Sequence, residues 1–382
     1  MSRSRLALMA MLGLVLSACD NSKAVDPPAE LVDIEPVLQV KQLWSDSLGG
    51  KSDHLRLGLQ PSVVNNVVYA AGFNGEVLAL NADTGRQLWR IRTRMELSAG
   101  PAAADGLVVV GSANGELVAL EADSGKQRWR QQLSGEMLSK ALIGHGLVIA
   151  RTVDGRLQAV NAADGTVRWS IEEPIPRLTL RGTAAPILAG EAVIAGFDNG
   201  KLVAVDAGTG DLLWNVTVSA PAGRTELDRL ADVDAPAAAS GKDVFVAGFN
   251  GRVAMLDLDN GQIWWARDAS SYRGFGLDDS IMYLTQSNGV IAALRRTDGN
   301  QQWETQALRQ RVLTAPAIMG ESLVVGDFEG YLHWLSKTDG KLQARAKTDG
   351  ERITNVPLVV DGRLYVQTDG GRLIAFEATP RG

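Results

Sequence analysis

Short runs of apolar residues alternate with glycine-containing turns along most of this chain. In one clear copy the apolar runs Leu107–Gly111 and Leu117–Glu121 flank the pair Asn114-Gly115. The pair Ser124-Gly125 then leads into a third run, which carries Trp129. An Asn-Gly pair between apolar runs predicts a two-residue β-hairpin, because both central residues of that turn need a positive φ. No 3.6-residue apolar period lies between the turns, which excludes an α-helical repeat.

The turn recurs at a spacing of about 40 residues, which is typical of a repeat architecture. An earlier run of small residues, marked by a proline in most copies, supplies a fourth strand to each copy. Four antiparallel strands in about 40 residues match one blade of a β-propeller. The repeat glycines are Gly75, Gly115, Gly155, Gly200, Gly251, Gly289, Gly330 and Gly371.

A tryptophan follows most repeat glycines at a fixed distance, and Ala344 takes its place in the seventh copy. The last copy ends before its own tryptophan strand, whereas the segment Gln39–Ser47 carries Trp44 in a matching strand. Pairing this first strand with the last copy closes the ring and removes two free strand edges. The sequence therefore predicts an all-β fold, an eight-bladed β-propeller of four-stranded antiparallel blades, closed by an N-terminal strand.

We expect the repeated tryptophans to pack between neighbouring blades, with the indole N–H on a backbone carbonyl, and not to form a platform for a ligand. Trp334 stands where most other copies have alanine, so we expect it to compensate for the tryptophan missing at Ala344.

The N-terminus has the pattern of a lipoprotein secretion signal. Arg3 and Arg5 precede the apolar stretch Leu6–Leu16, which is too short to span a bilayer. The residues just before Cys19 match a lipobox, and Cys19 is the only cysteine, so it is predicted to be the lipidation site and no internal disulfide can form. We predict a lipoprotein signal peptide over 1–18, a lipidated, poorly ordered tether over 19–38 and the propeller over 39–382.

Charge and chemistry exclude several functions. The net charge of −6 without a basic tract argues against nucleic acid as a partner and against broad binding to anionic lipid. The histidines His54, His145 and His333 are far apart, lack metal-ligand spacing, and are expected on the surface or in turns. Asp232 and Asp234 lack the pattern of a calcium loop and are expected in an acidic surface loop. We predict no catalytic residue, no metal and no cofactor.

Two consecutive copies of the repeat are longer than those before them. The extra residues fall after Trp169 and after Trp214, between the outer strand of one blade and the turn of the next. They should therefore lie side by side on one face of the disc, and such insertions often form the binding face.

The first insertion contains Leu178, Leu180 and Arg181, and the second contains Asp232 and Asp234. Aliphatic anchors and an arginine beside an acidic loop favour a protein–protein contact. The alternative is that the leucines form the inner strand of the fourth blade and that Arg181 pairs with a nearby carboxylate.

These two insertions, the lipobox, the tether, the closing strand and the segment Val324–Trp334 together resemble the BamB family, the propeller lipoproteins of the outer-membrane β-barrel assembly (BAM) machinery. The resemblance covers essentially the whole mature chain. It implies a non-enzymatic scaffold in the BAM complex, lipid-anchored to the outer membrane and facing the periplasm. Asp20, directly after the lipidated cysteine, is in some bacteria a signal for retention in the inner membrane, so that location stays open.

The resemblance also implies partners and contact residues. In the family the two loops bind the periplasmic POTRA region of BamA, which makes Leu178, Leu180, Arg181, Asp232 and Asp234 the implied contacts here. Other BAM subunits are further partners, and unfolded outer-membrane proteins are an additional candidate.

A second resemblance is to an enzyme class. The segment Ala82–Trp89 is similar to the blade-docking motif of quinoprotein alcohol dehydrogenases, which bind pyrroloquinoline quinone (PQQ) and calcium. Those enzymes generally have longer chains, and many carry an adjacent cysteine pair, whereas this chain has one cysteine. The shared motif therefore indicates blade packing, and a PQQ-dependent dehydrogenase remains the alternative function.

Overall fold

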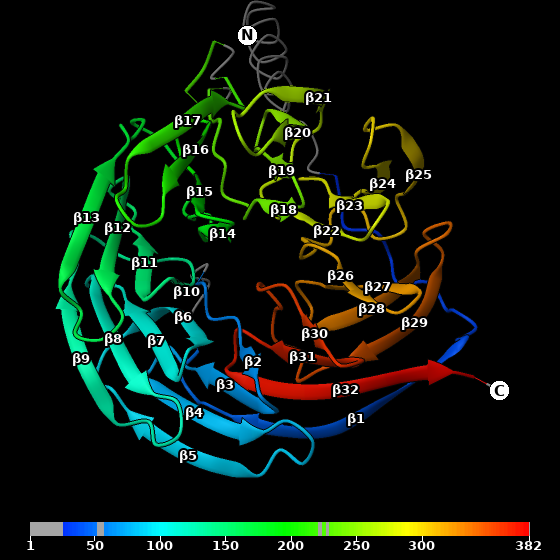
Figure 1. Cartoon of the computed structure of the whole chain (residues 1–382). Helices are drawn as coiled ribbons and strands as arrows, with labels where there is room; N and C mark the ends of the chain where they lie inside the picture. Colours follow the sequence, from blue (N-terminus) through cyan, green and yellow to red (C-terminus); the bar gives the residue numbers. More distant parts are fainter. Residues whose placement is uncertain (1–25, 52–56, 221–223, 227–228, 382) are drawn as a thin grey trace, which may run out of the picture.

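The computed structural model describes residues 26–51, 57–220, 224–226 and 229–381. Eight four-stranded antiparallel sheets surround a central axis like the blades of a propeller (Figure 1). The described residues include no α-helix, and therefore no helix that is long and apolar enough to cross a membrane. The predicted all-β, eight-bladed propeller is confirmed.

Each blade runs from a short inner strand to an outer strand. Blade 1 contains β2 (Ser62–Val64), β3 (Val67–Ala71), β4 (Glu76–Asn81) and β5 (Gln87–Arg92). Blade 2 contains β6 (Leu97–Ala104), β7 (Leu107–Ser112), β8 (Glu116–Glu121) and β9 (Gln127–Gln132). Blade 3 contains β10 (Leu142–Gly144), β11 (Leu147–Arg151), β12 (Arg156–Asn161) and β13 (Val167–Glu172). Blade 4 contains β14 (Ile187–Ala189), β15 (Ala192–Gly196), β16 (Lys201–Asp206) and β17 (Leu212–Thr217).

The second half of the ring repeats this order. Blade 5 contains β18 (Ala238–Ser240), β19 (Asp243–Ala247), β20 (Arg252–Asp257) and β21 (Ile263–Asp268). Blade 6 contains β22 (Phe275–Leu277), β23 (Ile281–Thr285), β24 (Ile291–Arg295) and β25 (Gln301–Thr305). Blade 7 contains β26 (Ala317–Met319), β27 (Ser322–Gly326), β28 (Tyr331–Ser336) and β29 (Leu342–Lys347). Blade 8 contains β30 (Leu358–Val360), β31 (Arg363–Gln367), β32 (Arg372–Pro380) and β1 (Leu38–Ser47).

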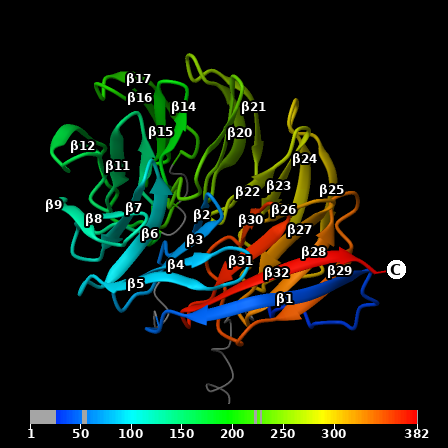
Figure 2. The ribbon, with the colours of Figure 1, turned by 60° about the horizontal axis from the view of Figure 1, so that its bottom comes forward.

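Blade 8 is built from both ends of the chain. β1 pairs antiparallel with β32 from Leu38 opposite Pro380 to Ser47 opposite Arg372. Figure 2 shows these two strands side by side along one edge of the disc. The pairing closes the ring and removes a free edge from each strand.

The repeated tryptophans join blades 1 to 6 each to the next blade. The indole N–H of Trp89 donates to the carbonyl oxygen of Ala122 at 2.7 Å, and a Cβ at Gly125 would lie 2.8 Å from the same ring. Gly125 also has a φ of +70°, so the turn requires glycine both for its conformation and for the packing of the indole. The same donation joins Trp129 to Ala162, Trp169 to Ala207, Trp214 to Leu258, Trp265 to Arg296 and Trp303 to Lys337.

Blade 7 lacks this tryptophan for a structural reason. The next blade has no covalent turn between its third strand, β32, and its outer strand, β1, so no turn is present to receive an indole. Trp334 on β28 lies opposite Ala344 on β29, is fully buried, and packs with it in one core cluster. Trp334 therefore packs beside the position of the missing tryptophan, and its compensating role stays a prediction.

Strand direction separates the connections between the two faces of the disc. Because the strands of each blade are antiparallel, the turns between second and third strands lie on the same face as the connections from an outer strand to the next blade. We call this the insertion face, because the long segments 173–186 and 218–237 are two of those connections. The turns between third and outer strands lie on the opposite face.

Candidate functional site

The two long connections meet on the insertion face. The first joins β13 to β14, and the second joins β17 to β18. The backbone N–H of Leu180 in the first donates to a carboxylate oxygen of Asp232 in the second. The predicted side-by-side arrangement is therefore present in the structure.

Asp232 and Asp234 are buried, with 0% and 4% of their surfaces exposed. The expectation of an exposed acidic loop is wrong for these two side chains. A buried carboxylate needs hydrogen-bond donors, and the backbone N–H of Leu180 is one of them. The carbonyl oxygen of Asp232 also accepts a bond from the N–H of Phe249, at 2.8 Å, so this residue ties the second connection to blade 5.

The first connection presents two apolar side chains and an arginine to solvent. Ile175 and Leu178 are 46% and 41% exposed, and Leu180 is half-buried. The inner strand of blade 4 begins at Ile187, so the alternative that the leucines form this strand is wrong. Arg181 donates to Glu136 at 2.6 Å, as the same alternative expected, and its side chain is still 42% exposed.

Glycines allow the second connection to press against blades 4 and 5. A Cβ at Gly196 would lie 2.5 Å from the side chain of Val233. A Cβ at Gly248 or Gly251 would lie 2.0 Å or 1.7 Å from the hydroxyl oxygen of Ser219. Since real Cβ contacts are never that short, only glycine permits this approach, and the base of the connection is fixed by close packing.

A buried ion pair lies next to the connections and was missed from the sequence. Arg151 on β11 donates to Asp198 at 2.7 Å, both side chains are buried, and the guanidinium lies over the ring of Phe197. The carbonyl oxygen of Phe197 accepts a bond from the N–H of Val233, so the pair supports the second connection. The signal was present, because Arg151 stands four residues before Gly155, where other copies have alanine, glycine, threonine or glutamine.

Both connections border a cavity. This cavity of about 140 Å³ is lined by residues of several blades, including Lys140, Asp234 and Arg273. The ammonium group of Lys140 donates to the carbonyl oxygen of Pro61 at 2.7 Å and to the hydroxyl of Ser62 at 3.0 Å. Burial lowers the pKa of Lys140 to about 7. These contacts join the connection that leads into blade 3 to the start of blade 1.

The described histidines differ from expectation in one case. His145 lies in a turn with a φ of 53°, as predicted, and it also contacts Glu191. His333 was also expected on the surface or in a turn, which is wrong, because it lies on β28 and is fully buried. His54 lies outside the described residues, as do Cys19 and the whole of 1–25. Within the described part of the chain no group of three or more metal-ligating side chains gathers.

The segment 26–37, predicted as poorly ordered tether, makes defined contacts with blade 7. The N–H of Ala29 donates to the carbonyl oxygen of Arg309, and the N–H of Val37 donates to that of Gln343, both at 2.9 Å. The prediction of poor order is therefore wrong for this part of the tether. The first strand also begins at Leu38, one residue before the predicted start of the propeller.

Comparison with known proteins places this geometry in a family. The family model described as outer membrane protein assembly factor BamB matches residues 38–94, 73–305 and 287–380. The chain is 44% identical over 370 residues to outer membrane protein assembly factor BamB of Pseudomonas aeruginosa, covering 97% of both chains. It is 35% identical over 390 residues to BamB of Escherichia coli, covering 98% of this chain and 100% of the relative.

Solved structures agree in fold. The crystal structure of BamB from Moraxella catarrhalis matches with a TM-score of 0.81 at 27% identity, covering 89% of this chain and 100% of that one. A quinohemoprotein alcohol dehydrogenase from Comamonas testosteroni matches with a TM-score of 0.69 at 16% identity, covering 88% and 76%. Identity that low shows only a shared propeller fold. By sequence over nearly its whole length and by structure, the chain belongs to the BamB family of outer membrane protein assembly factors.

Proposed function

We propose that this chain is a non-enzymatic scaffold subunit of the BAM complex, and that its insertion face binds the POTRA region of BamA to support folding and insertion of β-barrel proteins. One observation carries the proposal. The exposed residues Leu178 and Arg181 lie on a connection whose base is held by buried contacts. A rigid base that presents an aliphatic side chain and an arginine suits a protein interface, because little order is lost on binding.

The five predicted contact residues take two roles in this proposal. Leu178 and Arg181 touch the partner, because both are more than two-fifths exposed. Leu180, Asp232 and Asp234 position the surface, because they are half-buried or buried.

The anchor belongs to the same proposal. Residues 1–18 act as a lipoprotein signal peptide, and Cys19 carries the lipid that holds the protein at the outer membrane, facing the periplasm. The lipobox supports this assignment, and Asp20 makes the inner membrane the competing location. Replacing Cys19 with alanine should abolish lipid labelling, and density-gradient fractionation of membranes distinguishes the two locations.

Binding to a purified BamA POTRA fragment tests the interface. Arg181→Ala should weaken binding about thirtyfold, because truncating an interface anchor commonly costs about 2 kcal/mol. Arg130→Ala is a matched control, since Arg130 is 41% exposed and pairs with Glu116 at 2.9 Å on an outer strand. Melting temperatures of both variants should equal that of the parent within about 2 °C, because substitutions of exposed residues shift stability little.

The Arg130 variant shows whether loss of any exposed arginine weakens binding to the POTRA fragment. If both variants bind the POTRA fragment with equal affinity, the proposed interface on the insertion face is wrong.

A second candidate function is contact with unfolded barrel proteins at the outer strands. β17 and β21 are edge strands, and their side chains Leu212, Leu213 and Trp264 are 58%, 51% and 53% exposed. An exposed apolar edge can add a strand from another chain. Replacing Leu213 and Trp264 with lysine should reduce crosslinking to an unfolded barrel protein and leave POTRA binding unchanged.

A further inference from the structure

The segment 26–37 crosses the wall of the disc beside blade 7, and we call it the N-terminal strap. In Figure 1 its blue trace passes the orange strands of blade 7 before it enters β1. Asp26 pairs with Arg309, whose guanidinium donates at 2.9 Å. Leu31 packs against a core cluster that includes Leu308 and Leu313. The strap is therefore fixed by charge, apolar packing and backbone hydrogen bonds.

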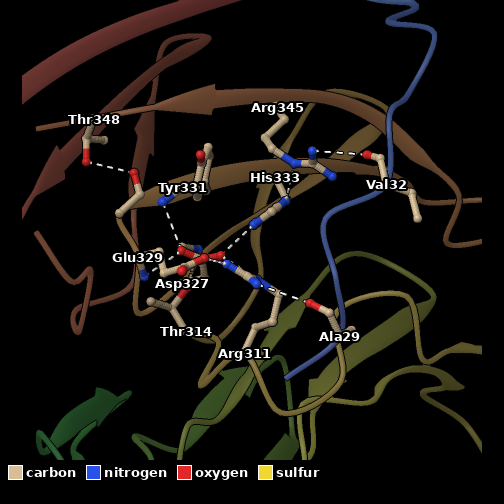
Figure 3. A network of polar contacts seen from close by, with 12 residues as sticks. Ala29, Val32, Arg311, Thr314, Asp327, Glu329, Tyr331, His333, Arg345 and Thr348 are labelled. Carbon is tan, nitrogen blue, oxygen red and sulfur yellow. Dashed lines mark hydrogen bonds and ion pairs between the residues drawn. The ribbon is translucent and has the colours of Figure 1, made fainter. Parts of the chain in front are cut away.

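Two arginines, one on the connection into blade 7 and one on β29, hold the strap by its backbone (Figure 3). Arg311 donates to the carbonyl oxygen of Ala29, and Arg345 donates to that of Val32, both at 3.1 Å. Because both bonds go to carbonyl oxygens, they fix the path of the strap without depending on its side chains.

A buried network orients these two arginines. Asp327, which is fully buried, accepts bonds from Arg311 at 2.8 Å and from Nε2 of His333 at 2.9 Å. Arg345 donates its Nε–H to Nδ1 of His333 at 3.3 Å. The imidazole satisfies both contacts when it is neutral, with its proton on Nε2. Burial lowers the pKa of His333, which favours this neutral form.

This network gives a structural role to a sequence motif that takes no part in the proposed interface. Asp327 and His333 both lie in the segment Val324–Trp334, which the sequence singled out. The second oxygen of Asp327 accepts the backbone N–H groups of Glu329 and Tyr331, at 3.0 and 2.9 Å. The motif thus forms a turn in which Asp327 orients Arg311, and Arg311 binds the backbone of the strap.

The strap runs from the insertion face to the opposite face. Arg309 and Arg311 lie on the connection between β25 and β26, which is on the insertion face. Gln343, which binds Val37, lies near the start of β29, next to the opposite face. Asp26, which pairs with Arg309, therefore lies at the insertion face.

We propose that the blade 7 network is a docking site for the strap, and that docking turns the insertion face toward the lipid surface that holds Cys19. This inference rests on the lipidation of Cys19 in the proposed function. Asp26 lies seven positions after Cys19, and seven extended residues span at most about 25 Å. Without docking, the free chain would reach to Leu38, nineteen positions away, and span about 65 Å. That length would let either face of the disc approach the membrane.

Energy transfer on vesicles tests the orientation. Lipidated full-length protein is bound to vesicles of phosphatidylethanolamine and phosphatidylglycerol that carry a headgroup acceptor dye. A donor dye is placed on the insertion face through Arg177→Cys or on the opposite face through Lys126→Cys, both exposed positions. Transfer should be several-fold stronger from the insertion face. Equal transfer from both faces of vesicle-bound protein would overturn the orientation alone, whereas failure of the protein to bind vesicles would overturn the anchor and the orientation together.

Two changes then test the role of the strap. Inserting twelve Gly/Ser residues between Val25 and Asp26 leaves the folded part intact and lengthens the free tether to about 65 Å, so the difference between the faces should be lost. Asp26→Ala/Leu31→Ala should reduce the difference by weakening docking, whereas Glu30→Ala, at an exposed strap position, should preserve it. A face difference that survives the inserted linker would overturn the proposal.

Discussion

The indole N–H of Trp44 donates to the carbonyl oxygen of Ala82 at 2.9 Å, and this bond joins the first strand of the chain to blade 1. Trp44 belongs to blade 8, so the contact extends the series of tryptophan contacts, which runs from blade 1 to blade 7, across the closure between blades 8 and 1. A Cβ at Gly85 would lie 2.6 Å from the Trp44 ring, which shows how closely the ring packs against the turn. Closure of the propeller therefore depends on this residue in addition to the β1–β32 ladder.

Replacing Trp44 with alanine should lower the free energy of unfolding by about 2–4 kcal/mol, because it removes a partly buried ring that packs on the Gly85 turn, together with its hydrogen bond. Trp264→Ala is the matched control, since Trp264 is 53% exposed and should change stability by less than about 0.5 kcal/mol. Urea unfolding followed by circular dichroism measures both. Similar losses in the two variants would mean that Trp44 does not hold the ring closed.

Replacing Asp232 with alanine should lower the free energy of unfolding by about 1–3 kcal/mol, because the backbone N–H of Leu180 loses its buried acceptor. Asp259→Ala serves as the control, because Asp259 is exposed and pairs only at the surface with Lys242. Thermal melts of the two variants provide the comparison. If the Asp232 variant melts at the same temperature as the control, the Asp232 carboxylate does not stabilise the fold.

Most of the fold could be predicted from the sequence, because its signals repeat. The glycine of each turn and the tryptophan that packs on the next turn recur at one spacing, so Trp44 could be matched to the open blade. The insertions could also be located, as interruptions of that spacing. The fold is predictable where a local signal and the closure of the ring require the same arrangement.

The burial of polar side chains was harder to predict. Asp232 lies in a non-repeating connection, so no other copy indicates which way its side chain points. His333 did carry a signal, because it stands three residues after its repeat glycine, where Leu78 and Val118 stand in other copies and are buried. The contacts of the strap could not be found in this way, because they join residues about 300 positions apart and follow no pattern.

Acid should destabilise the protein through the Asp327–His333 pair. Burial lowers the pKa of His333 below its usual value. On acidification the unfolded chain therefore takes up a proton before the folded protein does, so the free energy of unfolding decreases once the pH is below about 6.5. Although burial raises the pKa of Asp327, hydrogen bonds from His333 and the Tyr331 N–H lower it overall, so its contribution is lost below about pH 4.

The histidine share of this effect can be isolated with His333→Gln. Arg311, Arg345 and Glu329 face the pair in both proteins and remain unchanged. Urea unfolding at pH 7.5 and at pH 5 measures the free energy of unfolding of both proteins. From pH 7.5 to pH 5 the parent should lose more of this free energy than the variant does. A difference that does not change with pH would show that His333 titrates alike in both states.

Lys140 should produce a pH dependence in the alkaline range. Its pKa is about 7 in the folded protein, against about 10.4 in an unfolded chain, so between these values only the unfolded chain binds the proton. Stability contributed by this residue should therefore rise as the pH goes from 7 to 10. Relative to Lys140→Met, the parent should gain up to a few kcal/mol over that range in urea unfolding. A constant difference between the two proteins would contradict the lowered pKa.

Photo-crosslinking in cells tests the central claim, that the insertion face binds BamA, most directly. A photoreactive amino acid is placed at Leu178, and a second strain carries it at Leu88 on β5, which is similarly exposed at 45% against 41%. After irradiation, BamA should be crosslinked to the protein from Leu178 and not from Leu88. Crosslinking of BamA from Leu88, with none from Leu178, would contradict the account.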